Sequence, residues 1–234
     1  MINSTQNNQV KKLSKLSKRS YRYETKQYIV FGETLAREAI KAGHVTQLFV
    51  TDDFDINFEQ TKVSSAVMHK IVGEANTKIA ALCTMQTTDF DTGSTLILDN
   101  IQDPGNLGTM IRSAKAFGIN NIFLGLGTVD LYNSKVLRSM QGVNYYVNIQ
   151  QGDITEYLNH STNQLITTFL DEPSSDITAL DKSSAFDIMF GNEGHGLDPK
   201  YKRFERNNIV LDIEFESLNV AIAAGIIMYN LREK

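Results

Sequence analysis

The chain contains little cysteine and proline and lacks tryptophan. Its 234 residues include one cysteine, three prolines and no tryptophan. Cys83 cannot form an internal disulfide, and small secreted domains use cysteines in pairs, so we expect a reducing compartment, the cytoplasm. No run of 18 apolar residues occurs, and the N-terminus has no apolar core of signal-peptide length. We therefore expect neither a membrane span nor export.

Common catalytic signatures are missing as well. There is no G-x-x-x-x-G-K-[ST] loop and no G-x-S-x-G elbow, which argues against nucleotide hydrolysis through a P-loop and against a nucleophile elbow. The segment GLGTVD (125–130) lacks the third glycine of a dinucleotide fingerprint, so a small-molecule dinucleotide enzyme has little support. His195 has no second histidine or cysteine at ligand spacing, so we expect no metal site and a solvated loop histidine.

Charge is distributed unevenly along the chain. Residues 1–26 carry seven basic side chains and one acidic one, a net charge of +6, whereas the remaining residues carry −10. The basic residues Lys11, Lys15, Lys18 and Arg22 recur every three to four positions and would line one helix face. We interpret this segment as a phosphate-facing arm, and a solvated helix face without function is the alternative.

The first half of the chain predicts a small α/β unit. Strands are expected at 27–33, 46–50 and 78–83, and helices at 34–43 and 64–75. The polar segment MQTTDFDTGS has no periodic apolar face and is expected to be a linker. These features divide the chain into an arm (1–26), a small domain (27–86), a linker (87–94) and a second domain (95–234).

The second half alternates regularly between strands and helices. Strands are expected at 95–99, 120–126, 144–149, 164–170, 186–191 and 207–213, and helices at 106–117, 134–140, 153–159, near 197–204 and from Ser217 onward. This alternation predicts a parallel sheet covered on both faces. In such sheets ligands bind beyond the carboxyl ends of the strands.

Three segments place polar and glycine residues at those ends. In DNIQDPGNLGTMIRSAKAFG (99–118), the helical period turns Arg112 to the polar side, where it suits a phosphate or carboxylate. FDIMFGNEGHGLDP (186–199) holds three glycines around Glu193, so that backbone can approach a ligand. In EFESLNVAIAAGIIMYNL (214–231), Ser217 is a candidate helix cap and Asn219 lies in the first turn. A solvated arginine and a plain buried C-terminal helix are the alternatives for the first and third segments.

Taken in order, N-L-G-T-M-I-R-S-A-K-A-F-G, F-G-N-E-G-H-G-L and S-L-N-V-A-I-A-A-G resemble the three signature segments of the SpoU (TrmH-type) family of RNA 2'-O-ribose methyltransferases, within the SPOUT superfamily. The first half resembles the family's ribosomal-protein-like substrate-binding domain, preceded by its S-x-x-N-x-x-x-K-x-L arm (Ser4, Asn7, Lys11, Leu13). The segment before Ser217 departs from the family because it lacks the usual proline and glycine and is shorter.

The resemblance implies a parallel-sheet methyltransferase domain with a trefoil knot, a bound S-adenosyl-L-methionine, an RNA substrate and a homodimer. By matching positions, it assigns catalytic roles to Asn106, Arg112, Glu193, Ser217 and Asn219. It assigns cofactor binding to Gly191, Asn192, Leu211, Ile213 and Leu218, with Leu211 and Ile213 competing for one position. RNA-binding roles are expected for Lys11, Lys15, Lys18, Arg22 and Arg138.

The implied reaction needs a positively charged side chain near the ribose and no metal ion. The sulfonium methyl is already activated and its leaving group is neutral, whereas a ribose 2'-hydroxyl is a poor nucleophile until it is deprotonated. A guanidinium stays protonated, so Arg112 is expected to stabilise the alkoxide electrostatically rather than to act as the base. Large-subunit ribosomal RNA is the expected substrate, with transfer RNA, or a non-catalytic RNA-binding protein with a degenerate cofactor site, as alternatives.

Overall fold

The computed structural model describes residues 1–178, 180, 183–214 and 217–232, and these fold into two compact units. Unit 1 comprises residues 1–86 and 130–145, and unit 2 comprises residues 87–129 and 146–234. Residues 130–145 therefore pack with the N-terminal unit, although they follow a strand of unit 2. The basic segment 1–26 is also an integral part of unit 1. Within the described residues, no helix has the length and apolarity to cross a membrane.

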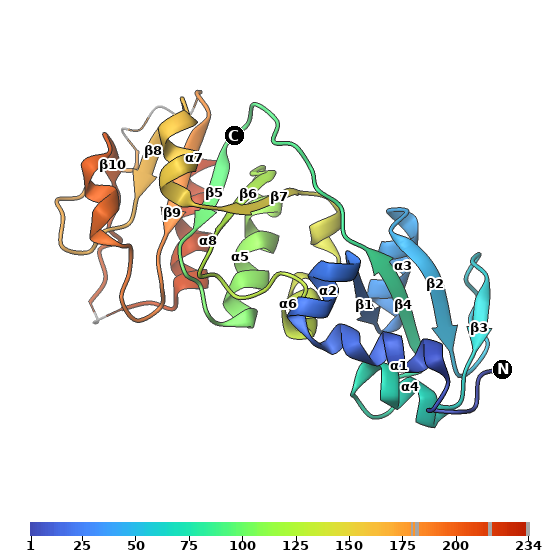
Figure 1. Cartoon of the computed structure of the whole chain (residues 1–234). Helices are drawn as coiled ribbons and strands as arrows, with labels where there is room; N and C mark the ends of the chain where they lie inside the picture. The colour runs from blue at the N-terminus through green and yellow to red at the C-terminus, as the bar shows by residue number, and fades with distance from the viewer. Residues whose placement is uncertain (179, 181–182, 215–216, 233–234) are drawn as a thin grey trace. The chain divides into compact units, whose positions relative to one another are not determined.

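Unit 1 contains a four-stranded mixed sheet with helices. The sheet order is β1-β4-β2-β3, in which β4 runs antiparallel to both β1 and β2, and β3 runs parallel to β2. Its elements are α1 (Asn8–Ser14), η1 (Lys15–Ser17), α2 (Arg19–Thr25), β1 (Gln27–Phe31), α3 (Glu33–Lys41), β2 (Val45–Val50), β3 (Gln60–Lys62), α4 (Ser65–Val72), β4 (Ile79–Thr84), α6 (Ser134–Met140) and η2 (Val143–Tyr145) (Figure 1).

The predicted strands and helices of unit 1 are confirmed to within a few residues, and β3 is an addition. All three residues of β3, Gln-Thr-Lys, are polar and half-buried, so the segment has no apolar alternation for sequence analysis to detect. Residues of α1, η1, α4, β2 and β4 share one apolar core, which includes Val10, Leu13, Phe49 and Met68. The basic segment is thus held in place by its apolar residues.

The expectation that Lys11, Lys15, Lys18 and Arg22 line one helix face is wrong. The segment forms α1, the 3-10 helix η1 and α2, and the chain is extended at Lys18 (ψ 128°). The Ser14 and Ser17 hydroxyls donate to the carbonyls of Lys11 and Ser14, at 3.0 and 2.9 Å. Serine hydroxyls that bond nearby carbonyls compete with helical backbone bonding, which accounts for the break.

Unit 2 is built on a six-stranded sheet in which every neighbouring pair is parallel, in the order β10-β8-β9-β5-β6-β7. The predicted parallel sheet is therefore confirmed. Its elements are β5 (Thr95–Leu98), α5 (Pro104–Ala116), β6 (Asn121–Gly125), β7 (Asn148–Gly152), α7 (Ile154–His160), β8 (Gln164–Thr167), β9 (Phe186–Phe190), η3 (Pro199–Arg203), β10 (Asn207–Asn208) and α8 (Val220–Leu231).

The central strands of this sheet are covered on both faces. Every residue of β5, β6 and β9 is buried, and side chains of a strand alternate between faces. One face carries Ile97, Phe123 and Met189, which pack with Ile154 and Leu158 of α7. Helices α5 and α8 pack against each other and lie side by side in Figure 1.

Several predicted elements of unit 2 are shorter than their sequence pattern. The strand expected at 207–213 is reduced to Asn207–Asn208, and the helix expected near 197–204 is a 3-10 helix. Strand β7 begins only at Asn148, because Val143–Tyr145 forms a 3-10 turn within unit 1. Strands β10 and β7 are the two edge strands of the sheet, where fewer neighbours enforce the local pattern.

Candidate active site at the carboxyl edge of the parallel sheet

A cavity of about 540 Å³ opens at the carboxyl ends of the sheet strands in unit 2. Its walls come from four segments that are distant in sequence, namely the residues that follow β8, β9 and β10 and the start of α8. Because parallel strands end at one edge of a sheet, these loops converge there. This cavity therefore lies at the edge of the sheet where the sequence predicts a ligand site.

The loop after β9 forms one wall of the cavity as a tight backbone hairpin. The backbone N–H of Asn192 donates to the Gly196 carbonyl at 3.0 Å, and the N–H of Gly196 donates to the Asn192 carbonyl at 2.9 Å. Gly196 has φ +69°, a left-handed conformation that favours glycine. A Cβ atom on Gly191 would lie 2.1 Å from the Gly196 carbonyl carbon, so only glycine fits at position 191.

Glu193 lies at the centre of a hydrogen-bonded cluster. Its Oε1 accepts hydrogen bonds from the Asp103 N–H and from Nδ2 of Asn106, both at 3.1 Å, and its Oε2 accepts from the Gln102 N–H at 3.2 Å. Burial raises the pKa of Glu193, but the hydrogen bonds from Asn106 and from the backbone outweigh burial and hold that pKa below its ordinary value. Glu193 is therefore a carboxylate at neutral pH.

Asn219 extends this cluster to α8. Its Nδ2 donates to Oδ1 of Asn106 at 3.0 Å, while its own Oδ1 accepts from the backbone N–H groups of Ala221 and Ile222 at 2.9 and 3.3 Å. Asn219 is thus the N-cap of α8, and the expectation that the helix begins at and is capped by Ser217 is wrong. An asparagine caps as effectively as a serine, and here it links Glu193, α5 and α8.

Arg112 lies on the exposed side of α5, as the sequence predicts, two turns after the start of the helix. In the described part of the chain, no hydrogen bond or ion pair engages its guanidinium, so the structure does not join it to the Glu193 cluster. Helix α5 begins at Pro104 with Asp103 as N-cap, two residues before the predicted start. Asp103 Oδ1 accepts from the Asn106 N–H at 2.8 Å, which sets the position of Asn106.

All five residues with expected cofactor roles line the same cavity, and Glu193 and Ser217 line it too. The five are Gly191, Asn192, Leu211, Ile213 and Leu218. Ile213 and Leu218 are 38% and 40% exposed, an unusual amount for apolar side chains inside a concave site. Leu211 and Ile213 both line the cavity, so either residue can occupy the cofactor-contacting position for which the two compete. Phe215 and Glu216, which belong to the shortened segment before Ser217, lie outside the described residues.

The five basic residues with expected RNA-binding roles divide into two groups. Lys11, Lys15 and Lys18 are exposed. Arg138, on α6, forms an ion pair with Glu74 at 2.9 Å and is partly exposed. Arg22, in contrast, is buried: its guanidinium pairs with Asp130, and both side chains are 8% exposed. Arg22 therefore holds residues 130–145 within unit 1 instead of facing a partner.

Sequence reasoning missed some contributions to the site. Gln102 places its N–H on Glu193, and its Nε2 donates to the Gly127 carbonyl at 2.7 Å. No sequence signal identifies a backbone donor of this kind. The Asp103-Pro104 pair was detectable, because a capping residue followed by proline is a helix-start signal. The segment after β8, from Thr168 to Asp171, lines the cavity without any motif of its own.

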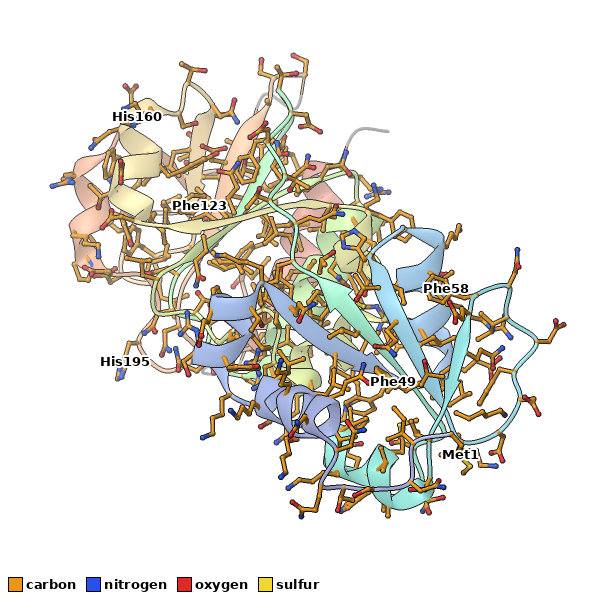
Figure 2. All side chains as sticks on the ribbon, turned by 45° about the vertical axis from the view of Figure 1, so that its right-hand side comes forward. Met1, Phe49, Phe58, Phe123, His160 and His195 are labelled. Carbon is orange, nitrogen blue, oxygen red and sulfur yellow. The ribbon has the colours of Figure 1, made fainter. Side chains whose placement is uncertain are left out.

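His195 is exposed, as expected, and Figure 2 shows it at the outside of the loop after β9. Its own N–H donates to Oδ1 of Asn192 at 3.2 Å. Within the described ranges, no group of three His, Cys, Asp or Glu side chains is arranged to hold a metal ion.

Comparison with known proteins gives consistent matches over nearly the whole chain. The model of the SpoU rRNA Methylase family matches residues 93–229, and that of the MRM3-like substrate binding domain matches residues 7–88. The chain is 33% identical to the 23S rRNA (guanosine(2553)-2'-O)-methyltransferase RlmP of Bacillus subtilis, over 99% of this chain and 98% of that protein.

Solved structures share the fold. The AdoMet-bound rRNA methyltransferase from Sinorhizobium meliloti superposes with a TM-score of 0.86 at 24% identity, covering 98% of this chain and 96% of that one. The SpoU methyltransferase AviRb from Streptomyces viridochromogenes, in complex with AdoMet, superposes with a TM-score of 0.84 at 20% identity, covering 97% of both chains.

Proposed function

The chain belongs to the SpoU rRNA methylase family, and on that premise we propose that it methylates a ribose 2'-hydroxyl of large-subunit ribosomal RNA with S-adenosyl-L-methionine as donor. The observation that carries the proposal is the convergence of Gly191, Glu193, Ile213 and Leu218 on one cavity at the carboxyl edge of the sheet. The 23S rRNA specificity named for the Bacillus subtilis relative supports the choice of RNA.

The cavity fits S-adenosyl-L-methionine in size and chemistry. Its volume lies within the range of about 300–1,000 Å³ that is usual for small-molecule sites. The exposed apolar side chains of Ile213 and Leu218 suit the face of an adenine ring. The hairpin 191–196 offers backbone groups to a ligand, and the Glu193 carboxylate on the same wall complements a cationic sulfonium. When bound there, this cofactor supplies an electrophilic methyl group.

The polar residues with expected catalytic roles would prepare the ribose oxygen. Arg112 is a fixed cation without a partner in the described residues, so its donors are free for a developing alkoxide and an adjacent phosphate. The cluster of Glu193, Asn106 and Asn219 would hold the start of α5 and of α8 in register with the cavity. Ser217, at the cavity wall, would contribute a hydroxyl to the ribose.

Unit 1 would hold the RNA. Its exposed cations Lys11, Lys15 and Lys18, together with Arg138, would contact phosphates. Arg22 is left out of this surface because it is buried in an ion pair. The same proposal assigns RNA binding to residues 27–86, a linker to 87–94 and methyl transfer to 95–234. It also includes a cytoplasmic location and a trefoil knot in the methyltransferase domain.

A homodimer is part of the proposal and rests on α8. Ile222, Ile226 and Tyr229 recur at helical spacing on this helix and are 56%, 40% and 50% exposed. Such an apolar stripe on the surface of a helix is typical of a face that packs against another chain. A second copy of this chain is the occupant that the family implies.

The decisive experiment combines calorimetry with S-adenosyl-L-methionine and a tritium-transfer assay on 23S rRNA fragments. We expect Arg112→Ala to bind the cofactor as the wild type does and to transfer methyl at least about 100-fold more slowly. The same oligonucleotide made as DNA should accept no methyl group, because it lacks the 2'-hydroxyl. Methyl transfer to transfer RNA but not to 23S rRNA would make transfer RNA the substrate. RNA binding without cofactor binding would favour the non-catalytic alternative.

A further inference from the structure

Unit 1 contains a second, smaller cavity of about 190 Å³, separate from the proposed methyl-transfer site. Its apolar lining comes from Ile29 and Phe31 of β1 and from Ile71 and Val72 at the end of α4. Tyr132, from the segment 130–145, adds a second aromatic side chain to Phe31. Three segments that are distant in sequence thus enclose one apolar hollow.

Arg22 forms a polar wall of this cavity. Its Nη1 donates to the carbonyls of Leu16 and Ser17 at 2.7 and 2.9 Å, and its Nη2 pairs with Asp130. Its Nε is buried and has no acceptor in the described part of the chain. The Arg22 side chain is held in place, because its three contacts go to two backbone carbonyls and a buried counter-charge.

Basic side chains flank the cavity on two sides. Lys15 and Lys18 are exposed neighbours of Leu16 and Ser17, which line it on one side. On the other side, Ser134 at the start of α6 lines it, and Lys135 follows Ser134 directly. Arg138, further along α6, lies 5.5 Å from the Phe31 ring and is partly balanced by Glu74. An apolar hollow between cations is complementary to a base flanked by phosphates.

We propose that this cavity binds one unstacked nucleobase of the RNA substrate, with the flanking phosphates held by Lys15, Lys18 and Lys135. The size supports this choice, since about 190 Å³ equals roughly six liquid waters and is below the range of drug-sized sites. One planar heterocycle fits within that limit. A phosphate would not be stable on the apolar floor formed by Ile29 and Ile71. The inference rests on the proposed function only in taking single-stranded RNA as the ligand.

The test closes the cavity without disturbing the fold. Ser134 is the exposed first residue of α6, so Ser134→Trp places an indole at the mouth of the cavity. Ser65, the exposed first residue of α4 in the same unit, does not line it, so Ser65→Trp is the matched control. The dissociation constant of the full chain for a fluorescent single-stranded RNA is measured by anisotropy at fixed salt. S-adenosyl-L-methionine affinity and the melting temperature verify that each variant is folded.

We expect Ser134→Trp to bind the RNA about 10-fold to 100-fold more weakly, the range for losing one stacked base. Ser65→Trp and Ser134→Ala should stay within about twofold of the wild type, since neither fills the cavity. Equal affinity of Ser134→Trp and Ser65→Trp would overturn the proposal. So would photocrosslinking of 4-thiouridine RNA to the wild-type chain, read by mass spectrometry, if no adduct formed on Phe31 or Tyr132. Adducts there without any methyl transfer would retain this site and reject the proposed function.

Discussion

Replacing Glu193 tests whether its hydrogen-bonded cluster positions the groups used in methyl transfer. The carboxylate accepts three hydrogen bonds, two at Oε1 and one at Oε2. Glu193→Gln retains one accepting oxygen and places an amide NH₂ where the other oxygen stood. If the amide oxygen takes the Oε1 position, the bonds from Asp103 and Asn106 persist and that from the Gln102 N–H is lost. Glu193→Ala loses all three.

The expected magnitudes follow from the number of bonds lost. A hydrogen bond contributes about 1 kcal/mol net, and the larger value for charged partners is not applied because Glu193 is solvent-exposed. Glu193→Gln should therefore slow transfer about fivefold, and Glu193→Ala about 100-fold, if transfer depends on the ordered cluster. Single-turnover tritium transfer with saturating cofactor and RNA measures both. Glu156→Gln, which changes an exposed acid on α7, is the matched control.

The pH profile supplies a second readout. The pKa of folded Glu193 lies below its ordinary value, so the cluster is fully formed above the pKa of the unfolded chain and is lost only as pH falls through the folded pKa. The wild-type rate should therefore show no loss from this group until the pH is below about 4.3. Glu193→Gln should lack that acid limb. Wild-type rates in Glu193→Ala, or equal rates in the Gln and Ala variants, would refute the positioning role.

Three further changes test other parts of the structure. Gly191→Ala should weaken cofactor binding, measured by calorimetry, at least about tenfold, because the new Cβ would lie 2.1 Å from the backbone of Gly196. In the control Gly194→Ala the new Cβ has no neighbouring atom closer than 3.6 Å, so this variant should bind the cofactor normally. Asp130→Asn leaves the buried Arg22 cation without its counter-charge. The free energy of unfolding of unit 1, measured by hydrogen exchange under urea, should therefore fall by about 3–5 kcal/mol, and a fall below about 1 kcal/mol would contradict this. Ile226→Glu should convert a dimer to monomer in light scattering, and an unchanged mass would remove α8 from the interface.

Local sequence signals predicted the elements that depend on their own residues. The buried strands β5, β6 and β9 are continuous apolar runs, and their alternation with helices led directly to a parallel sheet. The position of Arg112 on the exposed side of α5 followed from helical periodicity alone. The three glycine-rich and polar segments also carried the family resemblance, which the family match confirms.

Long-range contacts escaped the same reasoning. Lys18 and Arg22 look alike in a charge count, yet one is exposed and the other is buried, because Asp130 lies beside Arg22 although it is 108 residues away in sequence. Likewise, Ser217 and Asn219 are both good caps by composition, and the choice of Asn219 accompanies its bond to Asn106 on another helix.

The sequence by itself determined the parallel α/β architecture, the polar face of α5 and the set of residues at the carboxyl edge, because periodicity and glycine placement act within a few residues. Only the tertiary structure decided that Glu193, Asn106 and Asn219 form one hydrogen-bonded cluster, that Arg22 is an internal counter-ion, and that residues 130–145 complete unit 1. Those outcomes depend on which distant side chains satisfy a buried charge or a polar group, and that pairing is fixed when the chain packs.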